Sequence, residues 1–279
     1  MANRSVADIE VRLLVEAVYL RWGHDFRDYS LASLRRRVEH AREQMALPTI
    51  TAVQERVLHD PGGFAQLLQH LTVPVSEMFR DPPYFLALRR QVAPVLRTYP
   101  SIKVWVAGCS TGEEAYSLAI LLREEGLLDR AMVYATDINP ASLERARKGI
   151  YPLESMQLFT QNYQAAGGAE SFSRYYTAGY GGAVFDRALR ERITFADHSL
   201  ATDSVFAETH LVSCRNVLIY FNRTLQDRAL GLFHESLAHR GYLGLGSKET
   251  LEFSKWAGRF EPVARRERLY RKLPQGATP

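Results

Sequence analysis

The sequence predicts a doubly wound α/β domain with a mostly parallel sheet, an all-helical domain before it and a small antiparallel β-insertion within it. Three observations predict this fold class. Helical and strand-like patterns alternate from Tyr84 onward, the residues before position 72 show helical spacing alone, and an aromatic, glycine-rich stretch interrupts the alternation between Thr160 and Phe195. We therefore predict a helical domain at 1–71, a linker at 72–83 and an α/β domain at 84–279, with the insertion at about 172–195.

Apolar residues in the helical domain recur three and four positions apart, as on one face of an amphipathic helix. The first such stripe comprises Val6, Ile9, Leu13, Ala17 and Leu20. A second stripe begins at Leu31, and a further helical stretch begins at Pro48. The segment 60–63, Asp-Pro-Gly-Gly, predicts a break before a helix at 64–71. Prolines at 74, 82 and 83 exclude one uninterrupted helix over 72–83, which is why we interpret this segment as a linker.

The α/β alternation begins with a helix at 84–97, and its strands are short apolar runs rich in β-branched and aromatic residues. Before the insertion we predict strands at 102–107 and 131–136, and helices at 112–125 and 141–148. After it we predict strands at 193–196, 210–213, 242–246 and 269–273, and a helix at 224–238. The insertion itself predicts three short strands or a hairpin.

The composition limits the cellular setting and the classes of ligand. No stretch of the 279 residues approaches the roughly 18 consecutive apolar residues of a membrane span, and the first residues lack a secretory signal. The two cysteines, Cys109 and Cys214, exclude a disulfide framework and favour the cytoplasm. No Cys/His group has metal-ligand spacing, so we expect no metal. With a net charge of +4, an acidic protein partner fits as well as nucleic acid; we predict no nucleic-acid partner and a monomer.

The segment 102–117, I-K-V-W-V-A-G-C-S-T-G-E-E-A-Y-S, has the order strand, small-residue turn, helix start. This order forms the nucleotide-binding corner of an open α/β sheet. Its spacing is G-x-x-x-G instead of the G-x-G-x-x-G of dinucleotide enzymes, and Glu113 and Glu114 stand where a pyrophosphate would bind. The segment therefore favours a ligand with a nucleoside and a cationic end over an NAD-linked oxidoreductase. The competing interpretation is an ordinary strand–turn–helix without a ligand.

Asp137 follows the second predicted strand, where an acidic side chain can hold the two hydroxyls of a ribose. Alternatively, Asp137 is only the N-cap of the helix that follows, with Pro140 in its first turn. Asn139 fits that cap position better, which leaves Asp137 available for a ribose.

Four segments together resemble the CheR family of chemotaxis-receptor (protein-glutamate) O-methyltransferases, which use S-adenosylmethionine (SAM). They are 76–81 (S-E-M-F-R-D), 108–114 (G-C-S-T-G-E-E), 137–139 (D-I-N) and 214–221 (C-R-N-V-L-I-Y-F), and they occur in family order over nearly the whole chain. The resemblance implies a Rossmann-like SAM-dependent methyltransferase domain with a small antiparallel β-subdomain and a helical domain before it. It also implies methylation of glutamate carboxylates in the cytoplasmic helical domain of chemoreceptors, with S-adenosylhomocysteine as product, in chemosensory adaptation.

The resemblance further implies roles for individual residues. Arg80 and Tyr220 correspond to the family's candidate catalytic pair. Glu114 faces the methionine ammonium with Glu113 beside it, and Asp137 holds the ribose. The complete set implied to contact the cofactor is Ser76, Arg80, Gly108, Glu113, Glu114, Asp137, Ser199, Leu200, Arg215 and Asn216. Without the resemblance, Arg80 would be interpreted as a solvated linker arginine and Tyr220 as a half-buried aromatic at a strand end.

Pro74 and Ser199 depart from the family pattern, because many relatives have Asn at these positions. Each change removes an amide contact to the cofactor, a loss on the order of 1 kcal/mol. The departures motivate an alternative function, a SAM-binding regulatory or scaffold protein of a chemosensory system that transfers no methyl group. A glutamate carboxylate is already ionised at neutral pH, so the lack of a recognisable catalytic base does not count against an enzyme.

Arg35, Arg36 and Arg37 lie within one turn of the second predicted helix. Such a run is usually a solvated face, but an Arg-rich helix would also steer a glutamate-rich receptor towards the active site. These arginines are our candidate substrate-binding residues. The insertion resembles a β-subdomain that in some relatives captures a receptor's C-terminal peptide by adding a strand. Because its hairpin is shorter by a few residues, we expect no dependence on that tether.

Overall fold

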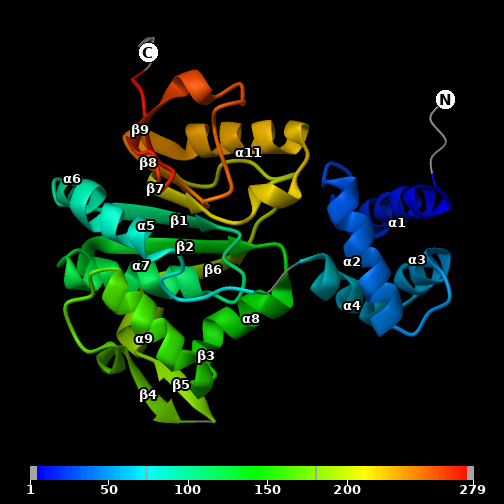
Figure 1. Ribbon diagram of the computed structural model, residues 1–279, viewed down its shortest axis with the longest axis horizontal. Coiled ribbons are helices and arrows are strands. Elements are labelled where there is room, and N and C mark those ends of the chain that lie inside the picture. The colour runs from blue at the N-terminus through cyan, green and yellow to red at the C-terminus, as the bar shows by residue number, and fades with distance from the viewer. Residues whose placement is uncertain (1–4, 73–74, 180, 275–279) are drawn as a thin grey trace. The chain divides into compact units, whose positions relative to one another are not determined.

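The architecture comes from a computed structural model that describes residues 5–72, 75–179 and 181–274. The chain divides into two compact units (Figure 1). Unit 1 comprises Met1–Pro74, Ser199–Asp203 and Tyr220–Ala229, and unit 2 comprises Val75–His198, Ser204–Ile219 and Leu230–Pro279. Two short segments from the second half of the chain therefore belong with the helical unit. The domain boundaries 1–71, 72–83 and 84–279 remain predictions.

The N-terminal part of unit 1 is helical, as predicted. Its helices are α1 (Val6–Trp22), α2 (Leu31–Gln44), α3 (Ile50–His59) and α4 (Pro61–Leu71). The local sequence explains where they begin and end. Ser5, Thr49 and Asp60 are N-caps whose side chains accept backbone N–H bonds, and Gly23 ends α1 with a φ of 77°.

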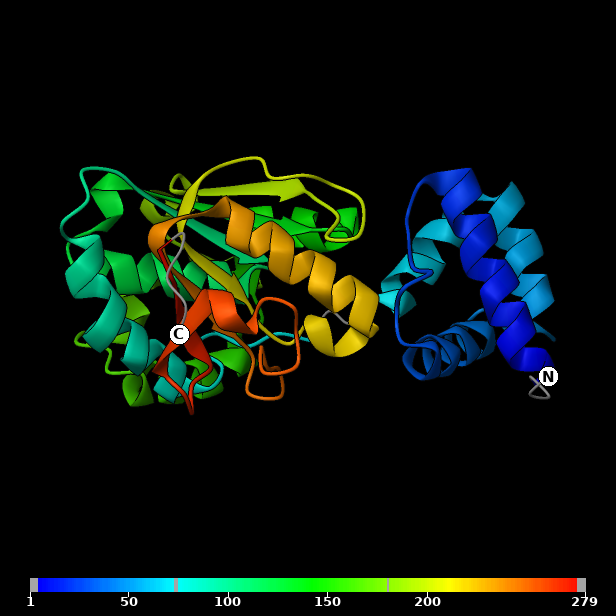
Figure 2. The same cartoon turned by 90° about the horizontal axis from the view of Figure 1, so that it is seen from above.

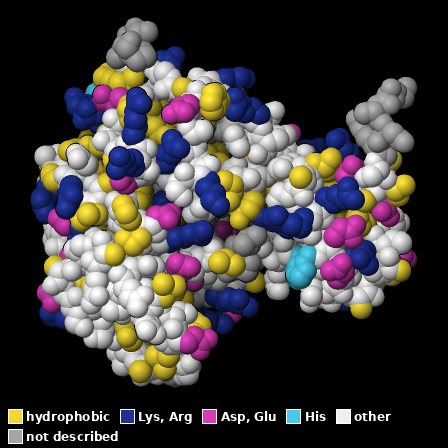
Figure 3. Space-filling model, viewed as in Figure 1, with side chains coloured by type: hydrophobic (Ala, Val, Ile, Leu, Met, Phe, Trp, Pro, Cys, Tyr) yellow, Lys and Arg dark blue, Asp and Glu magenta, His cyan; other side chains and the backbone are white. Residues whose placement is uncertain are grey.

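The buried face of α1 is not the apolar stripe that the sequence suggests. Leu13, a member of that stripe, is 56% exposed, and Val6, Ile9 and Leu20 are exposed too. The buried face consists of Val11, Leu14, Val15 and Val18. Because α1 is apolar on more than one side, helical spacing fits two stripes, and packing against α2 and α3 decides between them. Figure 3 shows hydrophobic side chains among the charged ones on the visible face of unit 1.

The break between α3 and α4 is shorter than the prediction, because α4 begins at Pro61 and not at Phe64. Gly62 and Gly63 therefore lie in the first turn of α4. A Cβ on Gly63 would come within 2.9 Å of the Cγ of Arg56 on α3. Glycine at this position permits the close approach of the two helices.

Unit 2 is built on a seven-stranded sheet in the order β6-β2-β1-β7-β8-β10-β9. Its strands are β1 (Ile102–Ala107), β2 (Ala131–Asp137), β6 (Ile193–Asp197), β7 (Thr209–Cys214), β8 (Leu237–Leu245), β9 (Phe260–Ala264) and β10 (Leu269–Lys272). The neighbours from β6 to β8 pair in parallel, whereas β10 is antiparallel to both β8 and β9. The prediction of a doubly wound, mostly parallel sheet is confirmed.

Helices cover both faces of this sheet (Figures 1 and 2). They include α5 (Pro82–Ala87), α6 (Ala93–Leu96), α7 (Glu113–Glu124), α8 (Pro140–Lys148) and α11 (Arg223–Ser236). Side chains alternate along β1, so Val104 and Val106 join the core that includes α7. Trp105 points to the opposite face, where its ring lies 5.4 Å from that of Phe233 on α11.

The helix expected at 84–97 is present in three parts. A π-helical turn, Leu88–Val92, joins α5 to α6, and the N–H of Ala93 donates to the carbonyl of Leu88. Pro94 lacks an N–H and its ring crowds the preceding turn, which favours such a shift in the hydrogen-bond ladder.

The insertion is a three-stranded antiparallel sheet in the order β3-β5-β4. Its strands are β3 (Ile150–Tyr151), β4 (Tyr176–Gly179) and β5 (Gly182–Phe185), with α9 (Met156–Ala165) and α10 (Arg187–Arg190) next to them in the chain. The structure differs from the predicted range of 172–195 at both ends. The first strand directly follows α8, and Ile193–Asp197 is β6 of the main sheet. Tyr180, part of the aromatic stretch, lies outside the described residues.

The last third of the chain departs most from the predicted elements. β8 begins at Leu237 instead of position 242, and β9 has no counterpart among the predicted strands. β9 contains Pro262, which is unusual inside a sheet but compatible with an edge strand, because one side of that strand has no ladder to maintain.

Candidate functional site

Candidate residues gather where β1, β2 and β7 end at the carboxyl edge of the sheet. Ala107 pairs with Thr136 of β2, and Val106 pairs with Ser213 of β7. The strand order reverses at β1, because the chain continues to β2 on one side and β7 lies on the other. In open α/β sheets, ligands bind outside the carboxyl ends of the strands at such a switch point.

The turn between β1 and α7 requires glycine at both ends. Gly108 and Gly112 have φ angles of 77° and 95°. A Cβ on Gly108 would lie 2.4 Å from Cγ2 of Val217, and one on Gly112 would lie 2.9 Å from the Cβ of Ala146. The glycine spacing therefore has a structural reason whether or not the turn binds a ligand.

Asp137, at the end of β2, does not cap the helix that follows. Asn139 is that N-cap, because its side chain accepts the N–H groups of Ala141 and Ser142. Asp137 Oδ2 accepts the N–H of Ser110 at 2.8 Å, and Oδ1 accepts the N–H of Asn139 at 2.9 Å. Each oxygen can accept a further bond, as two ribose hydroxyls require. Burial raises the pKa of the Asp137 carboxyl, and these backbone bonds oppose the rise.

Ser110 gives an independent sign that this corner is built for a ligand. Its Oγ is buried and has no hydrogen-bond partner among the described residues. Leaving a buried hydroxyl unpaired costs about 1–3 kcal/mol. Its φ of 50° adds backbone strain of the kind that clusters at functional sites. A polar ligand at the turn would supply the missing partner, so the residues present fit a nucleoside.

Glu113 and Glu114 begin α7 but face different surroundings. The buried Glu113 carboxylate accepts the Thr111 hydroxyl at 2.8 Å, and burial raises its pKa. Glu114 accepts the Ser213 hydroxyl at 2.6 Å and pairs with Arg215 at 3.0 Å. A cationic ligand end would therefore meet one carboxylate, Glu113, that has no arginine partner among the described residues and another, Glu114, whose charge Arg215 already balances.

Arg215, directly after β7, is the centre of a buried polar cluster. Its side chain is 1% exposed, pairs with Glu114 and with Asp81 at 2.8 Å, and donates to the carbonyl of Arg80 at 2.8 Å. Its guanidinium lies 4.3 Å from the ring centre of Tyr84. Burial acts to lower the pKa of Arg215, but Glu114, Tyr84 and Asp81 outweigh it and raise the pKa. Arg215 thus stays charged and joins the linker to the sheet.

The described part of the linker is held by several separate contacts. The N–H of Phe79 donates to the Ser117 hydroxyl on α7 at 2.9 Å, and the Phe79 ring packs on Phe85. Phe79 and Asp81 have φ angles of 53° and 56°, so Arg80 lies between two residues in the left-handed region. Such a backbone persists only where its surroundings impose it. Pro74, the first departure from the family pattern, lies outside the described residues.

Ser199 and Leu200, the residues expected to border an adenine, belong to unit 1. The N–H of Ser199 donates to Asp203 at 2.9 Å, and its hydroxyl accepts the N–H of Ala201 at 3.3 Å. Leu200 is buried. Their role remains a prediction.

Tyr220 also belongs to unit 1, whereas Arg80 belongs to unit 2, so their catalytic pairing remains a prediction. The guanidinium of Arg37 lies 3.9 Å from the ring centre of Tyr220. Arg37 is buried and donates to the carbonyl of Leu71, but its Nε and Nη2 have no hydrogen-bond partner among the described residues. Arg35 and Arg36 are exposed, and Arg35 pairs with Asp8. The three arginines therefore do not share one solvated face.

Sequence reasoning missed two residues that organise this corner. Asp81 is the last residue of the segment 76–81 and could have been recognised as the partner of Arg215. Glu249, in the loop after β8, accepts the N–H groups of Asn216 and Val217. Its position three residues after Gly246 was a weak signal, because side chains often bond backbone groups three residues away.

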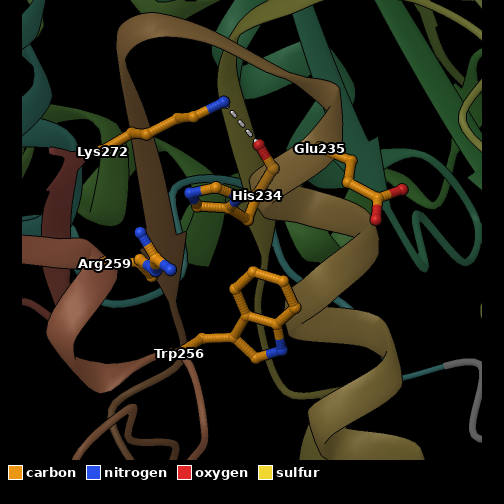
Figure 4. A pocket seen from close by; sticks show the side chains of 5 residues that line it. All are labelled: His234, Glu235, Trp256, Arg259 and Lys272. Atoms are coloured by element: carbon orange, nitrogen blue, oxygen red, sulfur yellow. Dashed lines mark hydrogen bonds between the residues drawn. The ribbon is translucent and has the colours of Figure 1, made fainter. Parts of the chain in front are cut away.

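A separate pocket of about 600 Å³ lies elsewhere in unit 2 (Figure 4). It is lined by His234, Glu235, Trp256, Arg259 and Lys272. Lys272, the last residue of β10, donates to the carbonyl of His234 at 2.7 Å. Because β10 runs antiparallel to β8, Lys272 is at the amino edge of the parallel strands, opposite the candidate site. None of the residues predicted from the sequence lines this pocket.

Residues 5–72, 75–179 and 181–274 contain no group of three His, Cys, Asp or Glu side chains that could hold a metal ion. Over the same residues, none of the helices combines the length and the apolar character that crossing a bilayer demands.

Comparison with known families matches nearly the whole chain. Residues 74–267 match the family described as the SAM-binding domain of CheR methyltransferase, and residues 9–72 match the CheR methyltransferase all-alpha domain. These two ranges correspond to the α/β and helical parts of the sequence prediction.

Individual relatives agree with the family match. A Pseudomonas putida protein provisionally named methyltransferase Cher3 is 65% identical over 98% of this chain and 100% of its own length. A chemotaxis protein methyltransferase of Listeria monocytogenes is 29% identical over 82% of this chain and 85% of its length. An uncharacterised Rhodobacter capsulatus protein is 32% identical over 95% of this chain, which spans only 28% of that protein.

Proposed function

Because this chain belongs to the CheR methyltransferase family, a family of SAM-dependent enzymes, we propose that it methylates glutamate side chains of chemoreceptors. The product would be a glutamate methyl ester in the receptor's cytoplasmic helical domain, formed during chemosensory adaptation. We propose that the enzyme acts in the cytoplasm as a monomer. The names of several relatives, chemotaxis protein methyltransferase, support this substrate class.

The observation that carries the proposal is the attachment of the linker to the corner after β1 and β7. Arg215 holds the carbonyl of Arg80 and the carboxylate of Asp81, and Phe79 is bonded to Ser117 of α7. These bonds fix the Arg80 backbone beside Glu114, at the edge of the sheet where we propose that the nucleoside of the cofactor binds. An arginine fixed there can orient an incoming carboxylate.

We assign cofactor binding to the residues of this corner and to two residues of unit 1. The set is Ser76, Arg80, Gly108, Glu113, Glu114, Asp137, Ser199, Leu200, Arg215 and Asn216. The unpaired hydroxyl of Ser110 and the remaining acceptor capacity of Asp137 support the assignment. Bound SAM supplies an electrophilic methyl group and leaves as S-adenosylhomocysteine.

The catalytic work left to the protein is alignment and desolvation. A glutamate carboxylate has a pKa near 4.3 and is ionised at neutral pH, so no general base is needed. Arg80 would hold the carboxylate through its planar fork of N–H donors, and the Tyr220 hydroxyl would donate to the second carboxylate oxygen. Both residues act by keeping the nucleophile in line and free of water.

We further propose that α2 receives the acidic receptor helix through Arg35, Arg36 and Arg37. Arg35 and Arg36 are exposed, as a steering surface must be. Arg37 is buried against Tyr220 and keeps two guanidinium nitrogens unpaired among the described residues.

Transfer from tritiated SAM to a purified receptor cytoplasmic fragment tests the proposal. We expect counts in the receptor that alkali releases as volatile methanol, because a carboxyl methyl ester is base-labile and a methylated amine is not. Wild-type protein that binds S-adenosylhomocysteine but labels no receptor would instead support the scaffold alternative. Protein that binds neither cofactor form would contradict both functions.

A further inference from the structure

Glu249 is a buried carboxylate held by backbone groups alone. Its Oε2 accepts the N–H of Gly246 at 2.6 Å and of Asn216 at 3.0 Å, and its Oε1 accepts the N–H of Val217 at 2.8 Å and of Ile219 at 3.4 Å. The residue is 4% exposed and forms no ion pair with a described Lys or Arg. One side chain therefore joins the loop after β8 to the turn after β7.

The geometry of both segments depends on this carboxylate. Asn216 has a φ of 62°, in the left-handed region that Asn enters more readily than most non-glycine residues. At Gly246, an added Cβ would lie 2.8 Å from the nitrogen of Asn216 and 2.8 Å from Oε2 of Glu249. The two backbones are thus as close as glycine permits, and the carboxylate fills the space between their N–H groups.

The turn that Glu249 holds carries the residues of the candidate site. Arg215 directly precedes Asn216 and bonds the carbonyl of Arg80. On the other side, Val217 is the residue that a Cβ on Gly108 would strike, so it packs on the turn after β1. Moving the backbone of 216–219 would therefore displace both Arg215 and the contact with Gly108.

We propose that Glu249 is a positioning residue, which sets the backbone of 215–219 and through it the cofactor-binding positions of Arg215 and Asn216. The carboxylate itself does not touch the reacting atoms. We call the four hydrogen bonds from the N–H groups of Asn216, Val217, Ile219 and Gly246 to Glu249 the backbone clamp. The inference rests on the proposed function only where it concerns cofactor affinity and methyl transfer, because the clamp itself is inferred from these hydrogen bonds.

Two substitutions perturb the clamp from opposite sides. Glu249→Gln keeps the shape but places an NH2 group against backbone donors, whereas Gly246→Ala keeps the charge and forces the two backbones apart. For both variants we expect faster amide exchange at 216–219 and S-adenosylhomocysteine binding weakened by tenfold or more. The KM for the receptor fragment should stay within twofold of wild type, because the clamp is on the cofactor side. The matched control, Glu252→Gln, alters an exposed carboxylate of the same loop and should change none of these quantities.

Hydrogen exchange with mass spectrometry measures the protection of the amides at 216–219, and calorimetry measures the affinity for S-adenosylhomocysteine. Unchanged exchange at 216–219 in Glu249→Gln, or unchanged affinity in a variant whose exchange has risen, would overturn the proposal. If Glu249→Gln does not fold, Gly246→Ala and the shorter carboxylate of Glu249→Asp carry the same test. A wild-type protein that binds no S-adenosylhomocysteine would refute the proposed function, while the exchange measurement would still decide whether the clamp exists.

Discussion

Replacing Asp137 by Asn should weaken cofactor binding strongly. In the structure each carboxylate oxygen accepts one backbone N–H, from Ser110 and from Asn139, and can accept one ribose hydroxyl. Asn keeps one carbonyl oxygen and turns the other acceptor into a donor. One charged hydrogen bond to the ligand is lost and the second becomes a neutral one.

The magnitude follows from these two bonds. A hydrogen bond to a charged group contributes about 1.5–3 kcal/mol and a neutral one about 1 kcal/mol, so losing one charged bond and weakening the other costs about 2–5 kcal/mol. This corresponds to a dissociation constant for S-adenosylhomocysteine raised by about 30- to 4,000-fold. The substitution also places an amide NH2 group against the N–H of Ser110 or of Asn139, so the melting temperature should fall. Because burial raises the pKa of Asp137, removing its charge offsets part of that loss.

Calorimetric titration with S-adenosylhomocysteine measures the effect. Asp197→Asn is the matched control, since Asp197 lies opposite Asp137 in the β2–β6 register but is exposed. The control should bind within twofold of wild type. Wild-type affinity in a folded Asp137→Asn variant would refute the ribose assignment.

Three further predictions test other parts of the account. Arg80→Ala should lower kcat by about 10- to 150-fold in the tritium assay, which is the contribution of one charged hydrogen bond. Arg90→Ala, at an exposed position, should leave kcat unchanged, and equal rates for the two variants would show that Arg80 has no catalytic role. Leu14→Ala should destabilise unit 1 by about 2–5 kcal/mol in denaturant unfolding, and Leu13→Ala by under about 0.5 kcal/mol. A larger effect of Leu13→Ala would mean that the stripe suggested by the sequence is the buried face after all. Burial and the nearby charges of Lys272 and Arg259 lower the pKa of His234 from 6.5 to about 4. The protein should therefore lose stability as the pH falls from 6.5 towards 4, because the unfolded chain takes up the proton at a higher pH than the folded protein does. Allowing for the partial exposure of His234, the loss is about 1–2 kcal/mol; His234→Gln should flatten this part of the pH–stability curve, and an unchanged slope would contradict the assignment.

The strands and the turn of the corner at 102–139 could be predicted from the sequence because their determinants are local. β1 and β2 are short apolar runs that end at glycine and Asp137, and the observed strands differ from the predicted ones by at most one residue. Asn139 was recognised as the better helix cap because capping depends on neighbouring residues only. Such features carry their evidence within a few positions of the chain.

The features that sequence reasoning missed depend on distant contacts. The buried face of α1 is chosen by α2 and α3, since the helix is apolar on more than one side. Glu249 lies far along the chain from the turn whose N–H groups it accepts. In the sequence it follows Lys248 in a polar loop, and such charged residues are usually exposed to solvent. β9 was missed because Pro262 is unfavourable in a strand, and only its position at the sheet edge makes it acceptable.

The most direct measurement for the central claim is mass spectrometry of a receptor cytoplasmic fragment after incubation with this protein and SAM. We expect one added methyl group on each modified glutamate side chain of the receptor helices, removed by mild alkali and formed about 10- to 150-fold more slowly when Arg80→Ala replaces the wild type. Methyl groups on lysine, on arginine or on no receptor residue, from protein shown to bind SAM, would contradict it.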